Sequence, residues 1–431
     1  MPRLALLLAL VGFAFPAAAQ SDYGSVYSRF ALGQRFESGT SQSDAMGGAG
    51  LAIRSGFYTG ADNPALSADL SLATFSASGL VRGVEATDAT DSTSVSTAGG
   101  LGSLQLALPL YAGKLGLALS YQPYTRVDYR AAREGTVELD GGTEQAYRSN
   151  LEGNGGLQQI SLGLGGKISE SLTVGASADA LVGTVEYLKR TEFPDALSSF
   201  TEVREAESTR LYGFTGTVGA TFSLLDLARE GDGLTLAGAV TLPTTLHGSR
   251  AFTLGSSLDR DTLATQEDGT ATLPLTARAG IAYRSGPRFL AAVDASYEPW
   301  SEFESDFAFG GYDPAGNDDQ ATLSDRLRVG GGVEWTPAGG RRGAPYVQLV
   351  SYRLGAYMED GLVSIDGQEL LTRALTGGIS LPTRFSNARL DLGFEIGTRG
   401  ETTGVLVEDL FWRGTLTLNF GERWFVRRRI G

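Results

Sequence analysis

The sequence predicts an all-β protein, a transmembrane antiparallel β-barrel of about 14 strands. From about residue 70 to the end, segments of about ten residues alternate apolar and polar side chains, as strands do between lipid and water. The connections between these segments are alternately long and short, which is typical of barrels with external loops and tight periplasmic turns. After the N-terminus no run of about 18 apolar residues offers a membrane helix, so any crossing is by strands.

The composition agrees with this fold class. The chain has 431 residues, of which 59 are glycine, none is cysteine and only 19% are charged. Long helices of a soluble protein need Glu, Lys and Arg on their solvent-facing sides, so this composition disfavours long helices. The lack of cysteine excludes disulfides, a lipoprotein anchor and thiolate metal sites. The net charge of -14 is unsuited to a nucleic-acid partner, because the phosphates would be repelled.

Residues 1–19 have the pattern of a secretory signal peptide. Arg3 gives a positive start, residues 4–15 form an apolar run, and Ala17-Ala18-Ala19 supplies small residues before a cleavage site. We place the cut before Gln20. The mature chain is therefore expected in the outer membrane of a Gram-negative-type cell.

The strands follow from the two-residue period. Leu104, Leu106, Leu108 and Leu110 share one face of the segment 103–111, and the segment 115–122 repeats the pattern after a short turn. The same test predicts fourteen strands, at 72–82, 102–111, 115–127, 156–166, 171–186, 208–224, 233–247, 272–284, 288–300, 325–336, 345–356, 370–382, 388–399 and 410–424. A soluble β-sandwich is the rival architecture, but strand length, loop alternation and the signal peptide favour the barrel.

The long connections are expected at 83–101, 128–155, 187–207, 248–271, 301–324, 357–369 and 400–409. They collect acidic residues, so we expect an acidic outer rim that includes Asp88, Asp140, Asp318 and Glu359. All four tryptophans (Trp300, Trp335, Trp412 and Trp424) fall near predicted strand ends, as an interfacial aromatic girdle requires.

Residues 20–70 do not follow the strand rhythm, whereas residues 71–431 do. Small residues crowd in this stretch, which lies just before the first strand. We expect it to fold into the barrel as a hatch on the periplasmic side. A disordered lead-in is the alternative.

Charged residues on predicted inward faces mix both signs. They are Asp179, Arg278, Asp294, Arg328, Glu334, Asp391, Glu395 and Arg413. Buried without partners they would be costly, so they should pair or stay hydrated. We expect a paired lattice that narrows the interior and favours a ligand leaving sideways.

The sequence offers little for catalysis. The single histidine, His247, stands near a predicted strand end beside Gly248 and Ser249, so a hydrolase is conceivable, but no oriented partner is evident. The acidic stretch 313–319 has carboxylates of the kind that bind calcium, but it lacks the ordered oxygen spacing of a dedicated site and is better explained as a solvated loop. We expect no catalytic residue, no cofactor and no metal.

Three motifs before the first strand carry a family resemblance. They are Val26-Tyr27-Ser28-Arg29-Phe30 with Leu32-Gly33, then Met46-Gly47-Gly48-Ala49-Gly50, and Asn63-Pro64-Ala65. With them the chain resembles the FadL family of hydrophobic-compound transporters, especially the divergent branch typical of the Bacteroidetes lineage. The resemblance implies a hatch that carries Asn63, Pro64 and Ala65, and a third strand kinked inward to open the wall.

Pro123 lies within the predicted third strand, where the missing N–H interrupts the hydrogen-bond ladder. It either marks that kink or merely ends the strand.

The expected function is passive uptake of hydrophobic small molecules, long-chain fatty acids or aromatic compounds, by lateral diffusion through the wall. Asn63, Pro64, Ala65 and Pro123 would form the gate. The alternative is a secretion or surface-attachment partner for exported proteins. In either case we expect a non-enzymatic monomer surrounded by outer-membrane lipid.

Overall fold

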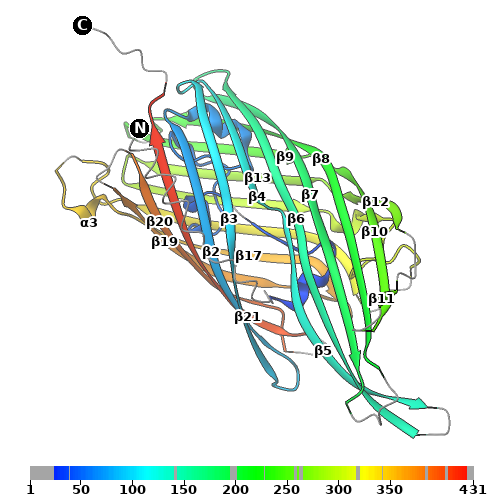
Figure 1. Ribbon diagram of the computed structural model, residues 1–431. Coiled ribbons are helices and arrows are strands. Elements are labelled where there is room, and N and C mark those ends of the chain that lie inside the picture. Colours follow the sequence, from blue (N-terminus) through cyan, green and yellow to red (C-terminus); the bar gives the residue numbers. More distant parts are fainter. Residues whose placement is uncertain are drawn as a thin grey trace, which may run out of the picture.

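In the computed structural model, the described residues are 24–37, 39–139, 143–194, 201–227, 229–256, 260–261, 266–316, 321–341, 343–383, 387–402 and 406–424. The predicted signal peptide lies outside them. The wall is a closed antiparallel barrel of 14 strands, because the last strand, β21 (Glu408–Glu422), pairs along its length with the first, β2 (Ala73–Thr87). The fold class expected from the sequence is confirmed (Figure 1).

Three wall strands are broken into two pieces. The third is β4 (Leu115–Pro123) and β5 (Thr125–Leu139), the seventh is β9 (Asp232–Thr241) and β10 (Thr244–Gly255), and the eighth is β12 (Glu267–Leu273) and β13 (Thr276–Ser285). The other wall strands are β3 (Thr93–Tyr111), β6 (Thr143–Lys167), β7 (Leu172–Glu192), β8 (Val203–Leu225), β14 (Phe289–Glu298), β16 (Ala321–Trp335), β17 (Ser351–Ile365), β19 (Thr372–Pro382) and β20 (Arg389–Arg399).

The remaining elements are short and are not counted among the 14 wall strands. They are η1 (Val26–Arg29), β1 (Gln34–Arg35), α2 (Ser41–Asp44), η2 (Pro64–Asp69), β11 (Arg260–Asp261), η3 (Trp300–Glu302), β15 (Glu304–Ser305), α3 (Tyr346–Leu349) and β18 (Gln368–Glu369). No helix among the described residues is both long and apolar enough to cross a membrane.

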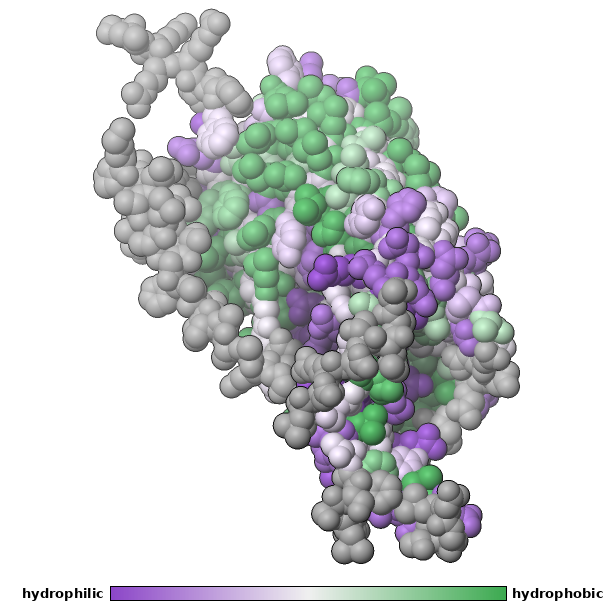
Figure 2. Space-filling view, turned by 45° about the vertical axis from the view of Figure 1, so that its right-hand side comes forward, coloured by the Kyte–Doolittle hydropathy of each residue, from purple (hydrophilic) through white to green (hydrophobic). Residues whose placement is uncertain are grey.

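The outer face of the wall is apolar, as the alternation predicted. Leu162 and Leu164 on β6, Phe214 on β8 and Leu375 on β19 are exposed, while their sequence neighbours turn inward. Figure 2 shows apolar side chains covering this face of the wall and polar ones gathering toward one end. In a membrane, lipid covers the apolar band, and the closed sheet satisfies the backbone groups.

Most of the predicted long loops are strands instead. The segment 128–155 was expected as a loop, but β5 continues to Leu139 and β6 starts at Thr143; β17 likewise continues through Glu359 to Ile365. Figure 1 shows the paired ends of β5 and β6 projecting well past the rest of the barrel. Beyond the membrane both faces of a strand meet water, so the apolar alternation stops while the backbone pairing goes on.

The aromatic girdle contains three of the four tryptophans. Trp335, Trp412 and Trp424 are exposed on the wall, but only 1% of the Trp300 surface is exposed. Trp300 was wrongly placed in the girdle, because the chain leaves the wall just before it, at Glu298, and turns into the interior.

Residues 24–70 pass through the inside of the barrel (Figure 1). Two short turns are fixed locally: Thr40 and Ser43 form a reciprocal capping box around α2, and the Asn63 side chain accepts from the Ala65 N–H at the start of η2. We call residues 24–70 the N-terminal segment.

Candidate functional site

The strand pairing of the wall is interrupted beside the third strand. Within the described residues, β3 pairs with β4 from Leu104 to Tyr111, whereas its earlier part pairs only with β2. The facing edge of β5 pairs only with the two residues of β1. Arg126 on β5 reaches across to the Leu101 carbonyl of β3, at 3.0 Å. We call the space between β3 residues 93–103 and β5 the lateral gap.

Pro123 ends β4, and the chain resumes as β5 two residues later. Opposite this break, Gly155 and Gly156 of β6 have φ values of +105° and +117°, which favour glycine. A Cβ on Gly156 would overlap the Thr125 carbonyl. The bend is therefore built from both strands. We missed the glycines, although the Gly-Gly pair inside a strand pattern was a signal for a bulge.

The N-terminal segment covers the β5 edge next to the gap. The Gly24 N–H donates to the Asp128 carbonyl at 2.6 Å, and the Asp128 N–H donates to Ser28 Oγ at 3.0 Å. The Phe36 ring lies between two guanidinium groups, 4.7 Å from that of Arg126 and 5.7 Å from that of Arg413. Edge groups that would otherwise be unpaired are thus satisfied from inside.

Asn63, Pro64 and Ala65 lie at the other end of β4. They begin η2, which rests on four wall glycines, Gly116 of β4, Gly165 of β6, Gly175 of β7 and Gly219 of β8. We call these four the glycine seat. A Cβ on Gly165 would lie 2.5 Å from both the Pro64 carbonyl oxygen and Ser67 Oγ, so only glycine lets the turn approach.

The four expected gate residues therefore lie at two separate sites. Asn63, Pro64 and Ala65 lie at the glycine seat, and Pro123 lies at the break between β4 and β5. Gly116 and Pro123 are seven residues apart on β4, about 23 Å along a strand. The seat and the break share a strand, and the N-terminal segment touches both ends of it.

The eight expected lumen charges all lie on inward faces. Arg413 and Glu395 pair with each other; Arg328 pairs with Glu359 at 3.1 Å, and Arg278 approaches Asp62 at 3.6 Å. Asp294 accepts the N–H groups of Gly50 and Leu51, both at 2.7 Å, and Asp179 accepts from Thr217 at 2.9 Å. Most partners thus come from residues that the sequence analysis did not select.

Arg326 is the centre of a cluster of buried ion pairs. Its side chain is fully buried and contacts Glu298 at 2.9 Å, Glu37 at 2.8 Å and Glu359 at 2.6 Å. Arg35 of the N-terminal segment adds a contact to Glu298 at 3.4 Å. Glu359 had been assigned to an acidic outer loop, which is wrong, because it lies on the inward face of β17.

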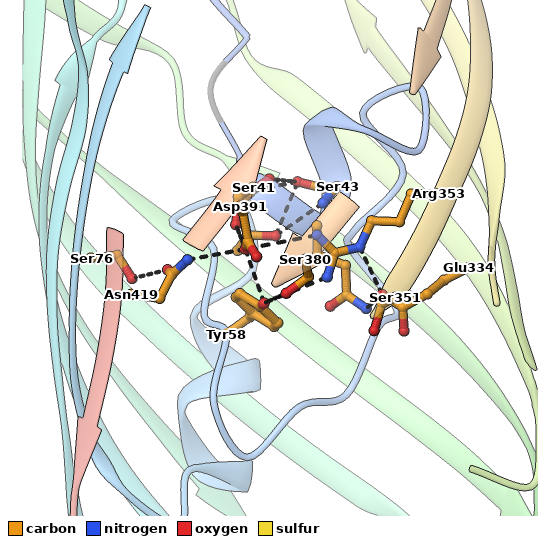
Figure 3. A network of polar contacts seen from close by, with 12 residues as sticks. Ser41, Ser43, Tyr58, Ser76, Glu334, Ser351, Arg353, Ser380, Asp391 and Asn419 are labelled. Carbon is orange, nitrogen blue, oxygen red and sulfur yellow. Dashed lines mark hydrogen bonds and ion pairs between the residues drawn. The ribbon is translucent and has the colours of Figure 1, made fainter. Parts of the chain in front are cut away.

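A second cluster joins the segment to the wall around Asp391 (Figure 3). Asp391 accepts from Tyr58 at 3.0 Å, from Asn419 at 3.0 Å and from Ser41. Arg353 lies 3.7 Å from Asp391 and donates to Glu334 at 2.8 Å. Arg353 and Arg326 were missed, although each shares the two-residue period of an inward charge, Arg326 with Arg328 and Arg353 with Glu359.

Burial and neighbouring charges shift the pKa values of carboxyl groups in the N-terminal segment. Burial alone would raise the pKa of Glu37, but Arg326 and Arg35 outweigh it and hold this pKa below its usual range. Burial raises the pKa of Asp44 to about 6, against the opposing effect of Arg413. It also raises the pKa of Asp62.

Above about pH 5, where Glu37 is largely ionised whether docked or undocked, docking of the segment should weaken as the pH rises because Asp44 loses its proton. Docked, Asp44 keeps its proton up to about pH 6, whereas the undocked carboxyl releases it above its ordinary pKa of 3.8. The stabilisation is complete below about pH 4 and is lost by about pH 6 to 7, a change of about 1–2 kcal/mol for a side chain that keeps some solvent contact. A spin label at Gly60→Cys should become more mobile from about pH 5 to about pH 7. Asp44→Asn should reduce this difference; equal mobility at both pH values would contradict the expectation.

His247 and the acidic stretch 313–319 were considered in the sequence and were not expected to form sites. His247 is exposed on β10, with its ring 6.1 Å from that of Tyr212. Among the described residues, no three His, Cys, Asp or Glu side chains are grouped to hold a metal ion. Part of the acidic stretch, 317–320, lies outside the described residues.

The fold is shared with solved outer-membrane proteins. The toluene transporter TbuX of Ralstonia pickettii is 15% identical, with a TM-score of 0.56 over 90% of this chain and 99% of that chain. The toluene transporter TodX of P. putida is 15% identical, with a TM-score of 0.56 over 91% and 100%. A FadL homologue of Pseudomonas aeruginosa is 11% identical, with a TM-score of 0.59 over 90% and 100%.

At these identities the likeness establishes a FadL-type barrel fold. The assignment to a Bacteroidetes-type branch stays a prediction. A comparison with curated protein sequences gives no match. The family model described as BamG matches residues 1–431, the full length of the sequence. The chain therefore belongs to the BamG family.

Proposed function

We propose that this barrel takes up hydrophobic small molecules passively and releases them sideways into the outer membrane through the lateral gap. The observation that carries the proposal is the gap itself, where β3 and β5 leave facing edges without strand pairing between them among the described residues. A ligand that prefers apolar surroundings needs no other driving force to pass from the interior into lipid.

The interior supports a sideways exit. The N-terminal segment and the Arg326 and Asp391 clusters occupy the interior, and the cavity beside the gap is small, about 90 Å³, and is lined by charged side chains that include Arg82, Arg126 and Glu395. A straight aqueous path would require many buried ion pairs to separate, each at a cost of several kcal/mol. In this proposal the segment is a hatch, and Asn63, Pro64 and Ala65 set its position on the glycine seat.

Cross-linking tests the gap, because the chain has no native cysteine. In Leu101→Cys/Arg126→Cys, a cleavable bis-thiosulfonate linker joins the two edges. We expect uptake of radiolabelled toluene or oleate by cells carrying the barrel to fall at least fivefold, and to recover after reduction.

The matched control is Leu104→Cys/Tyr121→Cys, a directly paired position of β3 and β4 where no gap exists. Linking it should leave uptake unchanged. Uptake that persists with the gap linked would remove the lateral route.

A second candidate function is attachment of exported proteins. Beyond Arg148 and Glu192, the last paired positions of β6 and β7, the described residues of β5 and β6 pair only with each other and form a two-stranded ribbon. Such ribbons are marginally stable alone, and a free strand edge is a template for a partner strand. Co-purification of an exported protein that is lost when residues 132–148 are replaced by a short turn would favour this function.

A further inference from the structure

The connection between β14 and β16 fills part of the interior. Trp300, Phe303, Phe307 and Phe309 turn inward from it, and each is at most 5% exposed. We call residues 300–312 the aromatic segment. Its β15 pairs with β12 over two residues, and it is also fixed at both ends, where Trp300 Nε1 donates to Glu298 at 2.9 Å and the Ala31 N–H donates to the Gly310 carbonyl at 2.8 Å.

These rings pack against leucines from five successive wall strands, Leu157 of β6, Leu181 of β7, Leu211 of β8, Leu246 of β10 and Leu273 of β12. We call these five the leucine layer. A barrel interior is ordinarily polar, and this one carries many charged side chains elsewhere, around Arg326 and Asp391. The leucine layer therefore presents a broad apolar surface to the interior. This surface is kept from water only while an apolar group covers it.

Between these ends, the side-chain hydrogen bonds that hold residues 306–308 lie where water can replace them. Asp306 accepts from the Thr270 N–H and hydroxyl at 2.7 and 2.8 Å, and both bonds are exposed. Arg250 donates to the Ala308 carbonyl at 2.6 Å and stacks 4.9 Å from the Phe307 ring centre. An exposed hydrogen bond adds little net stability, because water forms the same bond when the segment leaves.

The leucine layer borders the lateral gap. Tyr124, the residue between β4 and β5, belongs to the same apolar cluster as the layer. The Arg35 guanidinium stacks 3.6 Å over the Tyr124 ring. A molecule bound on the layer would therefore lie next to the break in the third strand.

We propose that the leucine layer is a binding chamber for small aromatic molecules, and that the aromatic segment occupies it until such a molecule displaces it. The inference rests on the uptake function proposed above and names where the ligand is held. The occupants indicate the ligand class: the rings of Phe303 and Phe309 meet edge to face at 6.2 Å, and those of Phe303 and Tyr312 at 5.2 Å. The space is thus shaped by phenyl rings, and toluene has the shape of a phenylalanine side chain.

Because the ligand competes with the aromatic segment, the direction in which a substitution changes ligand affinity can be predicted. A chamber that is mostly self-occupied binds ligand with an affinity reduced by the fraction of molecules in which it is free. Shrinking the occupant should therefore tighten binding. For Phe307→Ala we expect toluene to bind about tenfold more tightly, equivalent to about 1.4 kcal/mol.

Trp300 reports on the displacement directly. In a background of Trp335→Phe, Trp412→Phe and Trp424→Phe it is the only tryptophan, and its emission should shift to the red as toluene is added to the purified barrel in detergent. Phe307→Ala should reach half of this shift at about one tenth of the toluene concentration. Phe214→Ala, which removes a lipid-facing ring that is 76% exposed, should bind like the parent.

Each other outcome counts against a specific part. Toluene binding, measured independently by equilibrium dialysis, with no Trp300 shift, or with Phe307→Ala no tighter than the parent, would overturn the chamber while leaving uptake intact. A shift with oleate and none with toluene would overturn the aromatic class. Binding of neither compound to any variant would contradict the proposed function as well. Phe307→Leu keeps more apolar volume than Phe307→Ala, so its affinity for toluene should lie between those of the parent and Phe307→Ala. This milder variant also checks that the barrel stays folded.

Discussion

Arg326→Met should destabilise the barrel by about 3–5 kcal/mol, the range for removing one partner of a buried ion pair. Arg326 is fully buried among Glu298, Glu37 and Glu359. Methionine fills a similar volume but leaves three carboxylates facing one another without their shared cation. We would measure the loss by urea unfolding in detergent, followed by tryptophan emission.

Arg148→Met is the matched control. Arg148 pairs with Glu134 at 3.9 Å on the projecting hairpin, where both side chains are exposed, so its loss should cost less than about 0.5 kcal/mol. If the cost at Arg326 arises from unpaired carboxylates, adding Glu298→Gln should recover part of it. Equal stability of Arg326→Met and Arg148→Met would show that the cluster is hydrated and contributes little.

Gly165→Val should release η2 from the glycine seat. The new Cβ would lie 2.5 Å from the Pro64 carbonyl oxygen and from Ser67 Oγ. The strand that carries residue 165 is paired on both sides in the closed wall and cannot shift, so η2 has to move instead. The N-terminal segment should therefore undock while the barrel stays closed. Arg54, which pairs with Asp69 in the docked segment, should become accessible, and trypsin should cut after it at least tenfold faster.

The adjacent glycine provides the control. A Cβ on Gly166 would meet only Leu115 Cδ1, at 3.7 Å, which is ordinary contact. Gly166→Val should therefore be cut at the parent rate. If Gly165→Val also leaves cleavage after Arg54 unchanged, the seat does not position the segment. The same variant, if undocked, should admit larger hydrophobic ligands in the uptake assay.

The sequence alone determined the barrel. A two-residue period is a local property, since lipid selects every second side chain of a strand, and leucines at 104, 106 and 108 record that choice directly. The inward charges Asp391, Glu395 and Arg413 stood out for the same reason. The period failed where lipid ended, so β5 and β6 run far into a segment that was predicted as a loop.

Only the tertiary structure decided which groups meet. Arg326 finds Glu298, Glu37 and Glu359 on two other strands and the N-terminal segment, and no spacing along the chain encodes those distances. The bend at Pro123 depends on Gly155 and Gly156 across the sheet, and Trp300 lies inside because the chain leaves the wall at Glu298. Strand pairing and chain reversal bring such residues together, whereas the sequence fixes only the face on which each one lies.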